Sequence, residues 1–310
     1  MSQNPLHSVR ETTAWVAERA RHVHLLPDAL TVLAESLVAD GGVNQSWDRT
    51  PHFADGTPRT VQYLLVLDAL NFCFWPKPGL EYEHLALGLK RAIEADPHVF
   101  DAERLVQVEA DDLRRWVGAE LPQMEERVRL VREVGAGLLA HFGGQAANLV
   151  SAADHSAARL VSLLTAHFPG FRDHAVYDGR QVFFYKRAQI FAADVWGAFN
   201  GAGLGRFDDV HEMTMFADYR VPQYLRARGV LVYAPPLAEK VDARQEIAPG
   251  SPEEIEIRAA TVQAVEHLRS LLAQRGYDVP AVQVDWLLWE RAEAVRESLP
   301  PHHRTLTIYY

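Results

Sequence analysis

The sequence predicts a mostly α protein that folds as a single helical domain over residues 1–310, with one short β-hairpin. Apolar side chains recur at helical spacing along most of the chain, between residues that start and stop helices. The only convincing strand signal lies in residues 175–185, on both sides of Asp178 and Gly179, a pair typical of two-residue hairpin turns. No internal repeat, low-complexity tract or long linker divides the chain, so one domain is the simplest organisation.

Two helices are expected near the N-terminus, followed by a loop that carries aromatic rings. Residues 11–23 and 28–39 repeat apolar side chains with the helical period, and Gly41 and Gly42 end the second helix. The connector over residues 44–53 is polar and rich in turn formers, yet it contains an indole, an imidazole and a phenyl ring. Such rings either close over a pocket or pin the loop to the core, and the sequence leaves both interpretations open.

A central helix is expected over residues 61–75, where the pattern is apolar on nearly every face. Thr57 and Pro58 form an N-cap and first-turn pair in front of it. At the C-terminus, residues 305–310 either form a strand or dock their terminal rings on the body. Further helices are expected over residues 81–94, 111–117, 122–142, 156–168, 190–199, 208–217, 222–228 and 251–275, and from Pro280 onward.

The charge balance argues against binding of nucleic acid. The chain has 31 Lys and Arg against 41 Asp and Glu, which gives a formal net charge of -10. A protein that grips a nucleic-acid backbone normally presents a basic surface, so intact DNA or RNA is not the expected partner. One or two cations in a pocket suffice for a single phosphate, so a small-molecule substrate is expected instead.

Cysteine usage and hydropathy indicate a cytoplasmic protein. Cys73 is the single cysteine, which excludes an internal disulfide and a cysteine metal cluster and fits a reducing compartment. The N-terminal segment lacks the basic and apolar parts of a secretion signal, and no later segment offers about 18 uninterrupted apolar residues. We therefore expect a soluble cytoplasmic protein with no membrane contact and no obligate protein partner.

Several common catalytic devices are missing from the sequence. The pairs His22 with His24 and His302 with His303 lack i,i+4 spacing, and no carboxylate completes a familiar metal-ligand set. Cys73 lies in an apolar run, where thiolate formation is suppressed. The chain also lacks a dinucleotide fingerprint, a nucleophile elbow and a phosphate loop. We therefore expect neither a metal nor another cofactor.

The predicted helix that follows Pro280 sets carboxylates among apolar side chains. Its stretch 284–290 includes Asp285 and Glu290 between two tryptophans and several aliphatic residues. Burial of an ionised acid without partners costs several kcal/mol or raises its pKa. Asp285 is therefore either the salt-bridged acid of a core helix or a group held ready for chemistry, and periodicity alone does not decide between them.

Carboxylates and aromatic rings together suit a planar heterocycle attached to a sugar. Trp286 and Glu290 share a helical face, and Asp285 lies about 100° around the helix from Trp286. Phe216 and Asp218 stand at a predicted helix end. Planar bases stack on aromatic side chains, and a carboxylate accepts two N–H donors from a guanine-like edge. A second carboxylate near a sugar carbon stabilises an oxocarbenium-like transition state.

Four segments carry a more specific pattern: residues 70–75 (LNFCFW), 184–189 (FYKRAQ), 213–223 (MTMFADYRVPQ) and 285–290 (DWLLWE). In this order they resemble the queuosine salvage protein family, the queuosine 5′-phosphate N-glycosylase/hydrolases, over almost the whole chain. The resemblance implies a helical fold similar to that of helix-hairpin-helix DNA glycosylases. It also implies hydrolysis of the N-glycosidic bond of queuosine 5′-monophosphate, which releases queuine and ribose 5-phosphate for salvage of tRNA queuosine.

The resemblance further implies the roles of individual residues. Asp285 corresponds to the catalytic acid, which acts as a nucleophile or as a stabiliser of the transition state. We add three cations inside the matching segments as candidates for the 5′-phosphate, with a structural salt bridge as the alternative: Lys186, Arg187 and Arg220. The positions that correspond to base-binding residues are His52, Phe216, Asp218, Trp286 and Glu290.

Two other functions remain open from the sequence. A glycosylase of the same fold could excise a base from a DNA or tRNA strand, although the net charge of -10 disfavours this. A helical protein could also bind a modified 7-deazaguanine nucleoside or nucleotide without cleaving it. Salt-dependent binding of an oligonucleotide would indicate the first function, and an intact bound nucleotide the second.

Overall fold

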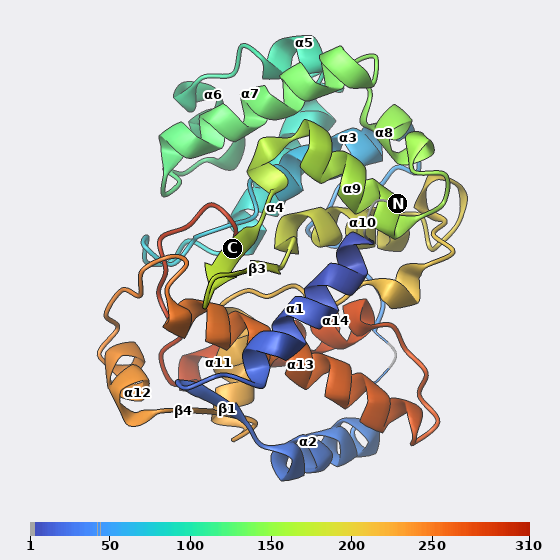
Figure 1. Ribbon diagram of the computed structural model, residues 1–310. Helices are drawn as coiled ribbons and strands as arrows, with labels where there is room; N and C mark the ends of the chain where they lie inside the picture. Colours follow the sequence, from blue (N-terminus) through green and yellow to red (C-terminus); the bar gives the residue numbers. More distant parts are fainter. Residues whose placement is uncertain (1–3, 42, 44) are drawn as a thin grey trace. The chain divides into compact units, whose positions relative to one another are not determined.

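The computed structural model describes residues 4–41, 43 and 45–310, and its chain is predominantly helical (Figure 1). These residues form fourteen α-helices and two antiparallel sheets of two strands each, which confirms the mostly α prediction. No helix among them is long and apolar enough to cross a membrane. Gly42, expected to help end the second helix, and Asn44, expected to begin the connector, lie outside the described residues.

The predicted hairpin is present, and a second small sheet was not predicted. Strand β2 (His174–Tyr177) pairs with β3 (Arg180–Phe183), and Asp178 in the turn has a φ of 44°, as a two-residue turn of this kind requires. The second sheet pairs β1 (Val23–Leu25) with β4 (Leu231–Tyr233). Strands of three residues are too short to show an alternating pattern, so the sequence carried little signal for them.

The chain contacts define two compact units, each assembled from separate segments. Unit 1 consists of Met1–Ser46, Asp173–Lys186 and Val210–Thr307, and unit 2 consists of Trp47–Arg172, Arg187–Asp209 and Ile308–Tyr310. The single-domain organisation therefore stays a prediction.

Unit 1 is organised around the long helix α13 (Pro252–Ala273). Ser251 caps its first turn by accepting the N–H of Glu254 at 3.3 Å, a role that serine favours at helix N-termini. Helix α13 packs against several other elements of unit 1, and their buried apolar side chains form one continuous core. Its helical neighbours are α1 (Pro5–Ala17), α2 (Pro27–Ala39), α11 (Arg220–Ala227) and α14 (Ala281–Ala294), and unit 1 also contains α12 (Pro235–Asp242).

In unit 2, helix α7 (Met124–His141) contacts α3 (Pro58–Ala69), α5 (Ala102–Leu105) and α6 (Ala110–Val117). Cys73 is fully buried in this unit beside Phe72 and Leu130, in agreement with its apolar sequence context. Helices α5, α8 and, in unit 1, α12 were not predicted. The other helices of unit 2 are α4 (Tyr82–Ala95), α8 (Ala146–Ala152), α9 (Ala157–His167) and α10 (Lys186–Ala198), whose first residue belongs to unit 1.

The first helix lies earlier in the chain than residues 11–23, where it was predicted. Helix α1 starts after Asn4, whose side chain caps it, and ends at Ala17. The backbone N–H groups of residues 21–23 donate to the carboxylate of Glu256 at 2.9, 2.6 and 3.1 Å. Because these groups bond to a distant side chain, the helix does not continue and the chain enters β1.

The central helix also ends earlier than predicted, at Ala69 instead of Trp75. Its N-cap is Thr57, as expected, and its burial on all faces confirms a core position. Beyond the helix, carbonyl groups within residues 70–73 accept hydrogen bonds from the guanidinium of the fully buried Arg127. The guanidinium of Arg127 thus satisfies carbonyl groups that would have accepted backbone N–H groups in a longer helix.

Residues 208–217 do not form the predicted α-helix. Only a 3₁₀ turn over Val210–Glu212 is present, and the chain then runs without helix or strand to Asp218. The segment 305–310 forms no strand either. Tyr310 is buried, and its carbonyl accepts the N–H of Cys73 at 3.0 Å, so the alternative of docked terminal residues is the one observed.

Replacing Arg127 with methionine should lower the free energy of unfolding by about 3–5 kcal/mol, because several buried carbonyl groups would lose their donors. Urea denaturation followed by circular dichroism measures this change. Arg129→Met on the same helix is the matched control, since Arg129 makes exposed ion pairs with Glu126 and Glu133. The control should lose less than about 1 kcal/mol. Equal losses of unfolding free energy in the two variants would contradict the role of Arg127 as the donor to these carbonyl groups.

Candidate active site

Asp285 lies in α14 with 5% of its surface exposed. Its Oδ1 accepts the backbone N–H of Phe216 at 3.0 Å. A hydrogen bond to a carboxylate favours the ionised form and fixes the plane of the group. The structure thus brings together the predicted catalytic acid and one of the predicted base-binding residues, which are 69 positions apart.

The stretch that contains Phe216 is held by side chains instead of by a helix or sheet. Arg258 Nε donates to the carbonyl of Ala217 at 3.1 Å, and Arg10 Nη2 donates to the carbonyl of Met213 at 3.0 Å. Together with the N–H bond to Asp285, these contacts account for the failure of the predicted 208–217 helix. The backbone here is positioned by charged groups from other elements.

Asp218 stands at the N-terminal end of α11. Its Oδ1 accepts the N–H groups of Arg220 and Val221, both at 3.0 Å, while Oδ2 makes no hydrogen bond to the residues that the structure describes. Burial raises the pKa of Asp218 above its ordinary value of 3.8, and the charge of Lys186 and the two N–H groups oppose this rise. One oxygen is therefore committed to the helix end, and the other remains available to a ligand.

Trp286 and Glu290 follow Asp285 on α14 but are less buried. Trp286 is half-buried and Glu290 is exposed. Their spacing of four residues puts both side chains on one face of the helix, as predicted. This face offers an indole ring and a carboxylate next to the turn that carries Asp285.

A buried ion pair that the sequence did not reveal supports this arrangement. Arg258 donates through Nη1 and Nη2 to the two carboxylate oxygens of Asp173, at 2.9 and 2.7 Å, and both residues are 2% exposed. Glu254 lies 3.5 Å from the same guanidinium. Asp173 Oδ2 also accepts the N–H of Lys186 at 3.0 Å. Among the charged residues of α13, Glu254 and Arg258 in its first two turns were the available sequence signal.

The three cations proposed for phosphate differ in their surroundings. Lys186 is 5% exposed, and its charge acts on Asp218. Arg220 pairs with Glu293 at 2.5 Å and donates to Gln223 at 2.8 Å. This ion pair corresponds to the structural alternative that the sequence left open.

Arg187 is 1% exposed and lies in unit 2. Its guanidinium donates to the carbonyls of Ala69 and Gly170 and covers the rings of Phe72 and Phe171. These contacts tie together parts of unit 2. Its assignment to phosphate binding stays a prediction.

His52 also belongs to unit 2, where an aromatic cluster encloses it. Its ring stacks on Trp47 with centroids 4.5 Å apart, and its two nitrogens contact the Asp48 carbonyl at 2.5 Å and the Tyr82 hydroxyl at 2.6 Å. Trp47 in turn donates to Asp194 at 3.0 Å. Burial lowers the pKa of His52 to about 4, so the ring is neutral near pH 7. The predicted role in base binding is untested.

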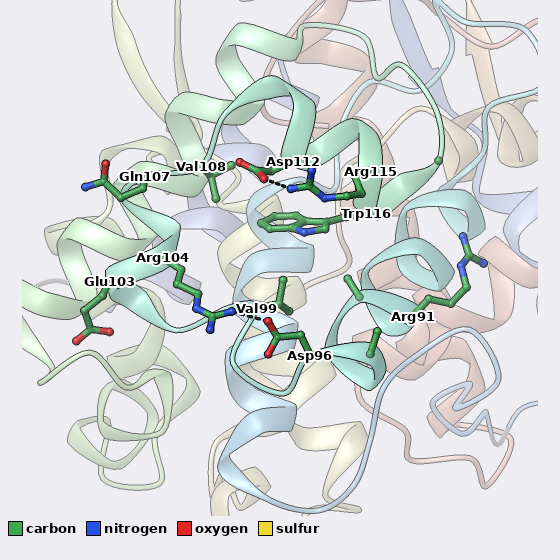
Figure 2. A pocket seen from close by; sticks show the side chains of 13 residues that line it. Arg91, Asp96, Val99, Glu103, Arg104, Gln107, Val108, Asp112, Arg115 and Trp116 are labelled. Atoms are coloured by element: carbon green, nitrogen blue, oxygen red, sulfur yellow. Dashed lines mark hydrogen bonds and ion pairs between the residues drawn. The ribbon is translucent and has the colours of Figure 1, made fainter.

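A separate groove of about 750 Å³ opens on unit 2 and contains none of the predicted residues (Figure 2). Two of its arginines are neutralised within the groove, since Arg104 pairs with Asp96 and Arg115 pairs with Asp112. This groove is therefore not the candidate active site. It is lined by Arg91, Ala92, Ala95, Asp96, Val99, Glu103, Arg104, Gln107, Val108, Asp112, Arg115, Trp116 and Gly118. In the described part of the chain, no group of three or more His, Cys, Asp or Glu side chains is placed to hold a metal ion.

Acidification should destabilise the protein partly through His52. The pKa of this ring is about 4 in the folded chain and returns to its ordinary value of 6.5 on unfolding. Between these values the unfolded chain binds the additional proton, so stability falls as the pH falls, by up to about 1.4 kcal/mol per pH unit. His52→Gln should reduce this slope in urea titrations between pH 4 and 7. His302, whose pKa burial also lowers to about 4, should maintain part of it. If His52→Gln leaves the pH dependence of the unfolding free energy unchanged, the lowered pKa of His52 is refuted.

Comparison with known proteins gives the same family as the sequence segments. Residues 51–310 match the sequence model of the family described as "Queuosine salvage protein". A protein of Dictyostelium discoideum named "Queuosine 5'-phosphate N-glycosylase/hydrolase" is 47% identical over 320 residues, which cover 99% of this chain and 100% of the relative. Proteins with the same name are 45% identical in Sphaerobacter thermophilus, over 97% of both chains, and 32% identical in Mus musculus, over 99% of both.

These matches extend over nearly the full length of each relative and include all four segments recognised in the sequence. The chain therefore belongs to the queuosine salvage protein family.

Proposed function

We propose that this chain is an N-glycosyl hydrolase that converts queuosine 5′-monophosphate into queuine and ribose 5-phosphate in queuosine salvage. The names of its relatives support this reaction. The structural observation that carries the proposal is the buried carboxylate of Asp285, oriented by the N–H of Phe216 at 3.0 Å. An ionised acid in this position suits cleavage of a glycosidic bond.

In the proposed reaction, water adds across the bond between C1′ of the ribose and the base nitrogen. The bond breaks towards an oxocarbenium-like transition state, and the negative charge of Asp285 stabilises the developing positive charge on the sugar. The hydroxyl of water is transferred to C1′, and its proton ends on the departing base. Because one oxygen of Asp285 already accepts an N–H, the carboxylate needs little reorientation during the reaction.

In the proposed complex, aromatic rings hold the base and carboxylates read its guanine-like edge. Phe216 and Trp286 supply the rings, and the available oxygen of Asp218 accepts N–H donors of the base. Glu290 contributes a second carboxylate from the exposed face of α14. For the 5′-phosphate, the candidate cations of unit 1 are Lys186, whose charge acts on Asp218, and Arg220, which also pairs with Glu293. Arg187 stays a prediction from the sequence.

The proposal includes no metal or other cofactor, no intact nucleic acid, no membrane and no obligate protein partner, and it places the reaction in the cytoplasm. Incubation of the purified protein with queuosine 5′-monophosphate, followed by chromatography, should detect free queuine and ribose 5-phosphate. Release should persist in the presence of EDTA. An intact nucleotide bound tightly after long incubation would replace the hydrolase with a binding protein.

Asp285→Asn should reduce kcat by about 100- to 1,000-fold, because the sugar cation loses its counter-charge. The amide oxygen can still accept the N–H of Phe216, so the melting temperature should stay close to that of the native chain. Queuine release under saturating substrate and a thermal melt measure the two quantities. A variant with near-native kcat would remove Asp285 from the mechanism.

Glu290→Gln should separate binding from rate. Glu290 is exposed and is proposed to contact the base in both ground and transition states, so its loss should raise KM about 3- to 10-fold with kcat changed less than about twofold. Glu297→Gln, which alters a side chain that is 94% exposed beyond α14, is the control and should leave both constants unchanged. A fall in kcat without a change in KM would contradict the base-binding role.

A further inference from the structure

We propose that Arg258 is a positioning residue for the proposed reaction: its guanidinium fixes the peptide segment next to Phe216 and thereby the orientation of the Asp285 carboxylate. This inference rests on the proposed hydrolase activity. It concerns a fully buried arginine in the long helix α13 of unit 1.

The guanidinium of Arg258 has contacts on its edges and on one face. Nη1 and Nη2 bind the carboxylate of Asp173 at 2.9 and 2.7 Å, and Nε binds the carbonyl of Ala217 at 3.1 Å. The ring of Phe184 lies under the plane, with its centroid 3.9 Å from Cζ. A planar group held in these directions has a single orientation, so the Ala217 carbonyl is fixed in space.

Ala217 lies between Phe216 and Asp218, the two predicted base-binding residues of this stretch, and next to the N–H that binds Asp285. The neighbouring N–H of Phe216 donates to Asp285 Oδ1 at 3.0 Å. The stretch is thus held by a cation on the carbonyl of Ala217 and an anion on the N–H of Phe216, in addition to Arg10 on the carbonyl of Met213. Because this backbone has no helix or strand partners, rotation of the segment is limited by these side-chain anchors.

The neighbouring binding groups have supports of their own. Asp218 is held by the N–H groups of Arg220 and Val221, and the backbone of Lys186 is held by Asp173. Loss of the bond from Arg258 to Ala217 should therefore affect the orientation of Asp285 more than it affects substrate binding. A lower kcat with little change in KM therefore indicates positioning of Asp285, whereas a general disturbance of the site would change both constants.

Arg258→Lys is the direct test. Lysine keeps a positive charge for Asp173 but is a point charge that cannot also reproduce the Nε bond to Ala217. We expect kcat to fall about 10- to 100-fold, since small misplacements of catalytic groups have effects of this size, with KM changed less than about threefold. Hydrogen exchange of a peptide that covers residues 213–218 should accelerate in the same variant, which tests the anchor independently of turnover.

Glu256→Gln provides a matched control from the same helix. Glu256 is 0% exposed and accepts three backbone N–H groups and the hydroxyl of Tyr177, but it has no bond to the 213–218 stretch. Its substitution removes a buried charge that, like Arg258, makes several hydrogen bonds. We expect kcat and KM within about twofold of the native values and unchanged exchange in residues 213–218.

Asp173→Asn keeps the test valid if Arg258→Lys does not fold. Asparagine retains an oxygen for the N–H of Lys186, and Glu254 remains 3.5 Å from the guanidinium. A smaller fall in kcat, about 3- to 10-fold, is expected with little change in KM. Native kcat and native exchange in these variants, or equal losses in Glu256→Gln, would overturn the proposal. Absence of queuine release by the native chain would instead refute the proposed function, and the exchange measurement would still decide the role of Arg258.

Discussion

The buried pair of Arg258 and Asp173 is the interaction on which the candidate site depends. Removal of two charges from water costs several kcal/mol per ion, and only close contacts with further hydrogen bonds recover this cost. The bidentate contact, the carbonyl of Ala217 and the ring of Phe184 provide such contacts. The pair connects three segments of unit 1 that are distant in sequence: the hairpin with the start of α10, the 213–218 stretch, and α13.

The same physical principle acts at other places in the molecule. Glu256 binds the N–H groups of residues 21–23, Arg127 binds carbonyls within residues 70–73, and Arg258 and Asp285 bind the backbone around Phe216. At each place a buried charge replaces the hydrogen bonds of regular secondary structure. Two of these places follow helices that were predicted to end later in the chain, and the third is the candidate active site.

This principle also changes the interpretation of Asp285. From periodicity, an acid in an apolar helix was either part of an ion pair or a group held for chemistry. The structure adds that the N–H of Phe216 satisfies one carboxylate oxygen and fixes the plane of the group. A carboxylate that is buried and oriented in this way suits stabilisation of a sugar cation.

The sequence by itself determined the features that depend on neighbouring residues. Local caps and hydrophobic period placed most of the long helices, including α13 with its Ser251 cap, and the Asp-Gly turn placed the hairpin. Four segments identified the family and nominated Asp285, and their spacing put Trp286 and Glu290 on one face of α14. Only the tertiary structure decided where α1 and α3 end, that residues 208–217 are not an α-helix, and that Arg258 and Asp173 support the site. The partners in these cases are far apart along the chain, and periodicity cannot report which distant charge will bind a given backbone group.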